Sequence, residues 1–374
     1  MNQNTQIIIV GGGLAGLTAA LHLLKNNCQV LLIEKQTYPK HKVCGEFISN
    51  EILPYLNYLD VDIESLQPTH ISKTSISTHN GDQISSDLSM GGFGVSRFAL
   101  DFYLYKEMIL KGGVVAHATV QNIVFENDEF TVQTTENQYF KSKIVLGSFG
   151  KRSSLDLQMK RSFIQKKSPW LAVKAHYHLP FDNDLVELHN FNGGYCGVSK
   201  VENNMVNICY LVQYEVFKQY KNIETFQKSV FAENSKLNAI FEQATLVFEK
   251  PLTISQISFE QKTQVENHVL MLGDTAGLIH PLCGNGMAMA IHSAKIASEL
   301  CLDFLQNKIN RATFENEYKH RWNHAFKSRL RMGKWLSKIL LNKRLSRILF
   351  QILLQFPAGL DLIIRKTHGK KLGV

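Results

Sequence analysis

The stretch IIIVGGGLAG, residues 7–16, decides the fold class of this 374-residue chain. Its first four residues are apolar and β-branched, which is typical of a buried parallel strand, and a glycine-rich turn follows them directly. Four leucines spaced 3, 4 and 3 residues apart then predict one face of a helix: Leu14, Leu17, Leu21 and Leu24. A second strand is predicted over residues 29–33 and ends in the acid Glu34. This order of strand, glycine loop, helix, strand and acid predicts a dinucleotide-binding unit.

Each part of the unit has a physical task in binding a dinucleotide. Gly11 allows the tight turn, Gly13 lets the backbone approach a pyrophosphate, and Gly16 lets the helix pack closely on the strand. The helix N-terminus supplies amide donors and a positive dipole end. Glu34 lies about 20 residues downstream, where the fingerprint expects an acceptor for a ribose diol. By itself, this fingerprint fits NAD and FAD equally.

Two neighbouring segments near the end of the chain favour FAD. VLMLGDTAG (residues 269–277) is a buried strand that ends in Gly-Asp, and HPLCGNGM (residues 280–287) leads into a helix. Together they resemble the GDAAG…P..G.G segment of the p-hydroxybenzoate hydroxylase-like flavoproteins, which include aromatic monooxygenases, flavin halogenases and geranylgeranyl reductases. The resemblance implies that Asp274 holds the ribityl chain of FAD. It also implies that Gly284 and Gly286 bring backbone amides to the flavin ring, where they stabilise its anionic reduced form.

A third segment, VSRFALD (residues 95–101), opens a predicted helix and is similar to the arginine-containing segment of the same family. The resemblance implies that Arg97 contacts FAD, while a surface ion pair with Asp101 is the alternative. Val120 matches the position that meets adenine through its backbone. The cofactor-binding residues expected on these grounds are Gly11, Gly13, Leu14, Ala15, Gly16, Glu34, Lys35, Arg97, Val120, Asp274, Gly284, Gly286 and Met287.

One segment departs from the family pattern. Many hydroxylases carry Asp-Gly after the corresponding strand, whereas this chain has LGSFGKRSS, residues 146–154. The missing acid puts in doubt the usual contribution of this position to binding NAD(P)H, the expected electron donor. Lys151 and Arg152 could attract a pyridine-nucleotide phosphate instead, or form a solvated basic turn.

The segment KVCGEF, residues 42–47, is similar to a Cys-Gly motif of geranylgeranyl reductase-like members, which makes that subgroup the closest match. The resemblance places Cys44 near the flavin, where a thiol would position substrate or supply a proton; the alternative is a small buried hydrophobe. Glu46 is either a proton relay or a loop carboxylate paired with Lys42, and the ion pair is favoured. Cys283 is expected to be a packing residue.

The resemblance covers roughly residues 5–310 and implies an α/β fold. A Rossmann-like FAD-binding domain of the glutathione reductase type 2 class is interleaved with an antiparallel-sheet substrate domain and followed by a helical region. The expected FAD-binding domain comprises residues 1–75, 95–160 and 265–310, the substrate domain 76–94 and 161–264, and the basic helical region 311–374. Alternating patterns predict strands over 170–179, 186–191, 194–200 and 205–212.

The predicted function is an FAD-dependent oxidoreductase that acts on a hydrophobic small molecule: an isoprenoid, a lipid or an aromatic polyketide. In the favoured reaction, flavin N5 delivers hydride to a C=C bond. A monooxygenase that hydroxylates through a C4a-hydroperoxide is one alternative, and a non-catalytic redox sensor or partner-docking protein is another. Flavin halogenases of the family that this chain resembles carry a Trp-x-Trp-x-Ile-Pro segment. Halogenation ranks last among the enzyme options, because none of Trp170, Trp322 and Trp335 lies in such a segment.

Cysteine spacing and the N-terminal residues predict a cytoplasmic protein without a metal site. The six cysteines are scattered, with no C-x-x-C pair and no Cys/His cluster at metal-ligand spacing. The polar first residues run directly into a strand, which is unlike a secretion signal.

Positive charge is concentrated near the end of the chain. Residues 319–371 contain fourteen Lys or Arg and one acid, Asp361, interleaved with apolar residues at helical spacing. Such helices either lie on an anionic membrane, here its inner face, or pack on the core as a subdomain with a solvated basic surface. Nucleic acid is disfavoured as a partner, because no known binding motif accompanies the charge.

Overall fold

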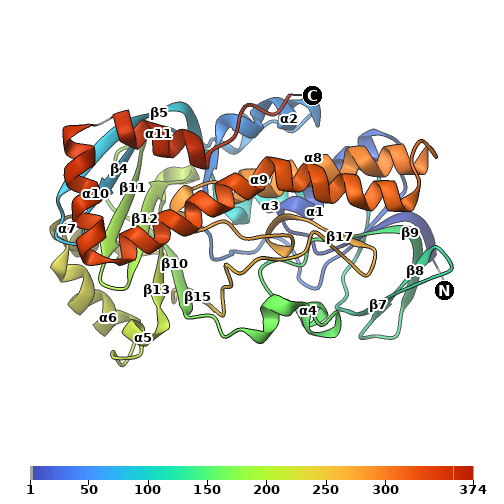
Figure 1. Cartoon of the computed structure of the whole chain (residues 1–374), viewed down its shortest axis with the longest axis horizontal. Coiled ribbons are helices and arrows are strands. Elements are labelled where there is room, and N and C mark those ends of the chain that lie inside the picture. Colours follow the sequence, from blue (N-terminus) through green and yellow to red (C-terminus); the bar gives the residue numbers. More distant parts are fainter. Residues whose placement is uncertain (1–2, 357, 374) are drawn as a thin grey trace.

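Two β-sheets lie side by side in the computed structural model, which describes residues 3–356 and 358–373 (Figure 1). The first sheet, at the right of the figure, contains the N-terminal dinucleotide unit, and the second lies at the left. Helix α9 (Arg311–Leu341) runs past both sheets to α10 (Lys343–Gln355) and α11 (Ala358–Thr367), which cover the far end of the second sheet. The predicted fold class is therefore confirmed.

Five parallel strands form the middle of the first sheet, in the order β17 (Val269–Met271), β9 (Tyr139–Gly147), β1 (Gln3–Val10), β2 (Val30–Ile33) and β6 (Val114–Ala116). Antiparallel additions to this sheet are β16 (Val265–Glu266), β7 (Val120–Glu126) and β8 (Glu129–Thr134). Ile7, Ile8 and Ile9 of central β1 are fully buried, which explains why this strand is a continuous apolar run.

Helix α1 (Leu14–Lys25) packs against both α3 (Arg97–Leu110) and α8 (Gly286–Leu305). Three of the four predicted face leucines are buried, and Leu24 is half-buried, so the predicted helix is confirmed. The N-termini of α1 and α8 both border the same cavity, which is described below.

The second sheet is antiparallel except where β11 pairs with β4. Its order is β14 (Thr245–Leu246), β10 (Trp170–His178), β13 (Val206–Gln213), β12 (Gly194–Lys200), β11 (Leu185–Phe191), β4 (Thr69–Ser77), β5 (Gln83–Gly94) and β3 (Phe47–Ser49), with β15 (Leu252–Ser255) also beside β10. The four strands predicted from alternation agree with β10 to β13 to within one residue at every end. The domain boundary expected at residues 75 and 76 lies inside β4, so the second sheet starts earlier in the chain than that boundary.

Short helices complete the fold: α2 (Leu53–Tyr58), α4 (Ser154–Gln158), α5 (Tyr214–Phe217), α6 (Ile223–Val230) and α7 (Ser235–Gln243). Phe226 and Leu237, from α6 and α7, pack against one face of the second sheet in a buried apolar cluster. Residues of the opposite face, such as Ala172 and Leu211, line the cavity.

The C-terminal helices pack on the core with one side. Phe314, Tyr318, Trp322 and Phe326 of α9 recur every four residues and are buried. Beyond α9, Phe350, Leu353 and Leu360 form a cluster with Ile84 of β5. No single described helix is long and apolar enough to cross a bilayer, although α10 and α11 pass that test as a pair bent by 116°.

A buried carboxylate ties the end of the chain to α9 and to the start of α8. Glu51 accepts hydrogen bonds from Arg329 Nη1 (3.1 Å), from Asn285 Nδ2 (3.1 Å) and from the amide of Gly369, and its carbonyl accepts from the amide of Leu372 (2.8 Å). Arg329 also donates to Asn285 Oδ1. These contacts fix the C-terminal helices relative to the loop before α8.

We expect Arg329→Met to destabilise the fold by about 3 kcal/mol, because it leaves the buried carboxylate of Glu51 without its cation. Arg331→Met, two residues along on the exposed side of α9, is the matched control and should change the free energy of unfolding by less than about 0.5 kcal/mol. Urea unfolding measures both changes. Equal effects of the two substitutions would contradict this account of Glu51.

Candidate functional site

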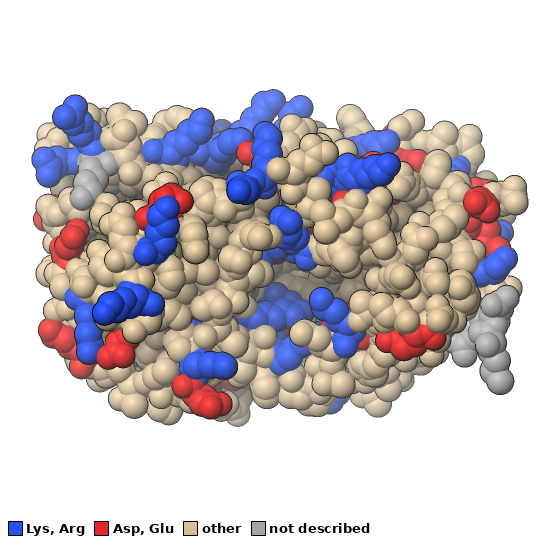
Figure 2. Space-filling model, turned by 90° about the horizontal axis from the view of Figure 1, so that it is seen from below, with Lys and Arg blue, Asp and Glu red and all other residues tan. Residues whose placement is uncertain are grey.

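A cavity of about 1190 Å³ is lined by residues from both sheets and continues beneath the C-terminal helices. A hollow bordered by Lys and Arg side chains is visible on the face shown in Figure 2. Twelve of the thirteen predicted cofactor-binding residues line this cavity, as does Cys44; the exception is Gly16. Residues from distant parts of the chain thus share one space, and their cofactor roles remain predictions.

The glycine loop has the backbone geometry that the sequence predicts. Gly11 has φ +104°, and a Cβ there would lie 2.4 Å from the carbonyl oxygen of Ser148. A Cβ on Gly16 would lie 2.1 Å from the carbonyl oxygen of Gly11, so this residue serves helix packing rather than the cavity wall. Gly13 is the N-cap of α1, and no side chain caps the helix, which leaves its first amides available to an anion.

Two cations face Gly13. A Cβ on this residue would lie 3.6 Å from Lys42 Nζ and 3.9 Å from Arg97 Nη2. Both cations are held by the buried carboxylate of Asp101, at 2.7 Å for Arg97 Nε and 2.9 Å for Lys42 Nζ. Arg97 therefore forms the ion pair with Asp101 that was the alternative to cofactor contact. The same pair also directs the guanidinium toward the glycine loop. The three side chains carry a net positive charge that suits a pyrophosphate.

The ion pair of Arg97 and Asp101 is stabilised in its charged form. Burial raises the pKa of Asp101, but Arg97 and Lys42 outweigh it and hold the pKa of this carboxyl below its usual range. Burial likewise opposes the charge on Arg97, yet Asp101 raises the net pKa of the guanidinium. Burial lowers the pKa of Lys42.

The adenosine end of the predicted site lies at Glu34. Its carboxylate accepts a hydrogen bond from the amide of Gly12 (2.7 Å) and pairs with Lys40 (2.8 Å). Burial opposes ionisation, but Lys40 and backbone donors leave the pKa of Glu34 lowered, so it is an acceptor at neutral pH. Lys35 and Val120 border the same part of the cavity.

The opposite end of the predicted site is built by Asp274 and the loop before α8. Asp274 is half-buried, and its carbonyl accepts a hydrogen bond from Lys262 Nζ (2.7 Å). Burial lowers the pKa of Lys262 to about 8. Gly284 has φ +60°, and α8 begins at Gly286 without a side-chain cap. The chain thus offers a second uncapped helix N-terminus to the cavity, where an anionic flavin ring would be stabilised.

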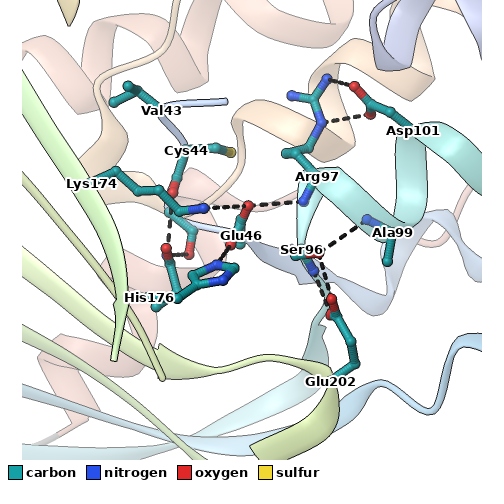
Figure 3. Close-up of polar contacts among 12 residues, drawn as sticks. Val43, Cys44, Glu46, Ser96, Arg97, Ala99, Asp101, Lys174, His176 and Glu202 are labelled. Carbon is teal, nitrogen blue, oxygen red and sulfur yellow. Dashed lines mark hydrogen bonds and ion pairs between the residues drawn. The ribbon is translucent and has the colours of Figure 1, made fainter. Parts of the chain in front are cut away.

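Glu46 is fully buried at the junction between β10 of the second sheet and the start of α3 (Figure 3). It accepts hydrogen bonds from Lys174 Nζ (3.1 Å), from His176 Nε2 (2.7 Å) and from the amide of Arg97 (2.8 Å). Burial raises its pKa, but these partners outweigh burial and the pKa of Glu46 is lowered. The predicted pair of Glu46 with Lys42 is wrong, because Lys42 lies beside Asp101 and Glu46 reaches the second sheet instead.

Cys44 is half-buried and borders the cavity near this junction. Asn207 of β13 fixes its loop by donating to the carbonyls of Cys44 (3.2 Å) and Gly45 (2.9 Å). Two other thiols border the cavity, and burial raises the pKa of each to about 12: Cys209 and Cys283. Both are therefore poor acids at neutral pH, in agreement with the packing role expected for Cys283.

Lys174 and Asn207 were not predicted from the sequence. A lysine inside the apolar strand WLAVKAHYH, residues 170–178, was the available signal, because a buried lysine needs a carboxylate partner. Among the aromatic residues of the second sheet, Tyr195 borders the cavity, whereas Phe191 and Tyr210 pack against Phe226 of α6.

We expect Gly13→Val to fold but to lose FAD. A Cβ at this position meets the rest of the protein only at ordinary contact distances, yet a valine side chain would occupy the space in front of the two cations, so FAD affinity should fall at least about tenfold. Flavin absorbance of the purified protein and its thermal unfolding are the measurements. Gly11→Val is the contrast, since it clashes with backbone and should unfold more easily. A yellow, stoichiometrically loaded Gly13→Val protein would contradict the assignment.

Sequence relatives of this chain include reductases and a halogenase. Residues 6–46 match the family described as FAD dependent oxidoreductase. Digeranylgeranylglycerophospholipid reductase 1 of Methanopyrus kandleri is 21% identical over 353 residues, which are 89% of this chain and 90% of the relative. Its counterpart in Methanococcoides burtonii is 24% identical over 349 residues, covering 87% and 81%. Tryptophan 2-halogenase of Chondromyces crocatus is 20% identical over 356 residues, covering 86% and 66%.

Solved structures share the fold. The flavin-dependent brominase Bmp2 gives a TM-score of 0.80 at 14% identity, covering 98% of this chain and 93% of the brominase. Halogenase PltM in complex with phloroglucinol and FAD gives 0.78 at 15% identity, covering 94% and 80%. At such identities the likeness concerns the fold alone. The sequence comparisons therefore show an FAD-dependent oxidoreductase domain at residues 6–46, and the relatives of the chain include digeranylgeranylglycerophospholipid reductases and a halogenase of the same FAD-binding superfamily.

Proposed function

We propose that this chain is a reductase that saturates a C=C bond in a long apolar substrate, such as an isoprenoid or lipid chain, with electrons delivered through FAD. The observation that carries the proposal is the lining of the cavity. Cations line it at the glycine loop, and apolar residues of the second sheet and of the C-terminal helices line another part, which is called the apolar arm below.

Aliphatic and aromatic side chains make up most of the wall of this arm. The sheet side is formed by Ile76, Ile84, Val186 and Leu188, and the helix side by Leu340, Leu349, Phe350, Leu353, Leu360, Ile363 and Ile364. A long hydrocarbon chain would lose its contact with water on both sides in this space. The cationic end suits the phosphates of the cofactor and not an apolar chain. FAD and the substrate would therefore bind in different parts of one cavity. The relatives that act on digeranylgeranyl lipids support the same class of substrate.

When bound and reduced, FAD supplies the hydride for one alkene carbon. The second carbon needs a proton, and Cys44 is the proposed donor because its thiol is half-buried and borders the cavity near the junction between β10 and α3. Asn207 and Glu46 hold the loop that carries this thiol. The apolar arm excludes water, which protects the reaction from competing proton sources.

NAD(P)H is the proposed electron donor. Lys151 and Arg152 border the cavity after β9, and Lys151 Nζ donates to the carbonyl of Val43 (3.3 Å), within the segment that carries Cys44. These cations suit a pyridine-nucleotide phosphate.

The reaction class is tested by anaerobic reduction of the purified, FAD-loaded protein with NADPH. We expect the reduced protein to be oxidised by a polyprenyl substrate, with one C=C bond saturated for each NADPH consumed. Rapid reoxidation by oxygen, with a hydroxylated product, would instead support a monooxygenase. Absence of any substrate-dependent turnover with NADPH or a reductase partner would contradict the enzyme proposal.

Cys44→Ser should lower turnover of a polyprenyl substrate without loss of FAD.

The substrate arm is tested by Leu353→Trp, which fills the space between α10 and β5. Leu353 is 5% exposed, whereas its neighbour Leu354 is 56% exposed and lies outside the arm, so Leu354→Trp is the matched control. We expect Leu353→Trp to raise KM for a long polyprenyl chain about tenfold or more, since overpacking displaces the ligand. KM for a short prenyl alcohol should change little. An unchanged KM for the long chain would place the substrate elsewhere.

A further inference from the structure

Helix α10 has apolar residues on two opposite sides. Phe350 and Leu353 are 4% and 5% exposed and face the arm of the cavity. Leu345, Ile348 and Ile352, spaced three and four residues apart, are 47%, 53% and 51% exposed. Their spacing places them along one stripe of the helix, on the solvent side.

Further large apolar side chains are exposed on the same group of helices. They are Trp335 of α9, Leu354 of α10, Phe356 in the connection and Leu362 of α11, each more than half exposed. Within residues 335–362, seven large apolar side chains face solvent, although only a small part of the chain lies there. Exposed apolar residues scattered singly need no explanation, but a concentration of this kind marks an interaction surface.

Cations accompany these apolar residues. Lys334 and Lys338 of α9, Arg344 and Arg347 of α10, and Lys366 of α11 are exposed. The one acid of residues 319–371, Asp361, is already paired with Arg365 at 2.8 Å. The outer surface of α10 and α11 therefore combines positive charge with unburied aliphatic side chains, at the end of the molecule away from the first sheet (Figure 1).

We propose that this outer surface docks on an anionic lipid bilayer. A bilayer can satisfy both features at once, because acyl chains accept the aliphatic side chains while anionic headgroups pair with Lys and Arg. A second copy of the chain would bring like charges together. Nucleic acid would pair with the cations but leave Leu345, Ile348 and Ile352 in water.

The same helix that contacts the bilayer forms the wall of the arm. Ile348 and Ile352 lie on the outer side of α10 and Phe350 and Leu353 on the inner side, so one helix separates the arm from the docking surface. Glu51 holds α9 and the tail at Gly369 against Asn285, which fixes the surface relative to the cofactor loop. If the proposed reductase function is right, the apolar substrate passes from the membrane, past α10, into the arm.

Vesicle sedimentation with the FAD-loaded full chain tests the docking surface. We expect wild-type protein to sediment with vesicles of phosphatidylcholine and phosphatidylglycerol and much less with phosphatidylcholine alone. The double substitution Ile348→Glu with Ile352→Glu should lower the partition coefficient at least tenfold, and Arg344→Gln with Arg347→Gln should lower it about tenfold for the anionic vesicles only. High salt should weaken wild-type binding.

The matched control is Ile109→Glu with Leu110→Glu at the end of α3, where two apolar side chains are 41% and 78% exposed on another surface. It should bind vesicles like the wild type. Equal binding by the α10 double variant and the wild type would overturn the proposal, as would wild-type binding that ignores lipid charge. Self-association abolished by the α10 variant, or binding of duplex DNA in place of vesicles, would also overturn it.

FAD content and turnover of a short, water-soluble prenyl substrate without vesicles separate this proposal from the reductase function. Both quantities should be the same in the wild type and in the α10 double variant, because Ile348 and Ile352 lie outside the cavity wall. Vesicle binding without any turnover would remove the reductase proposal and leave the docking surface in place.

Discussion

The buried carboxylate of Glu46 is the interaction on which the site depends. A carboxylate removed from water is costly unless strong donors surround it, and two elements supply three donors: β10 provides Lys174 and His176, and α3 provides the amide of Arg97. Because the third donor is the first residue of α3, Glu46 also holds the start of that helix, next to its N-cap Ser96. Since this hydrogen bond fixes the backbone of Arg97, it also positions the guanidinium that faces Gly13 of the glycine loop. The carboxylate of Glu46 thus holds three parts of the site together: the second sheet, the loop that carries Cys44, and Arg97 of the cofactor site.

The parts of the fold that follow from local pattern were predictable from the sequence. The loop at residues 11–16, the leucine face of α1 and strands β10 to β13 each carry a period or a glycine requirement that needs no knowledge of distant residues. Arg97 and Asp274 were found through resemblance to family segments. Glu46 could not be assigned correctly, because Lys42 is four residues away in sequence while Lys174 is 128 residues away, and only the folded chain brings it closer. The extent of the second sheet could not be predicted for a related reason: β4 pairs with β11, far along the chain.

The C-terminal helices show why an amphipathic sequence pattern can be compatible with two structural interpretations. Packing on the core and contact with a membrane were alternatives in sequence, since both predict apolar residues beside cations. In the structure α10 has enough apolar residues for two surfaces. Phe350 and Leu353 meet β5, and Ile348 and Ile352 remain unburied. A wide apolar arc in a short helix can therefore indicate two contacts, and helical periodicity alone does not separate them.

The anchoring of the tail at Glu51 makes the end of the chain a neighbour of the cofactor loop. The amides of Gly369 and Leu372 bind the same residue whose carboxylate also holds Asn285, one position before α8. A purification tag or fluorescent domain attached soon after Leu372 would lie close to this contact and would crowd it. Fusion at the other end, where β1 enters the sheet, leaves the contact intact, so the choice of tagged terminus is itself part of preparing a functional sample.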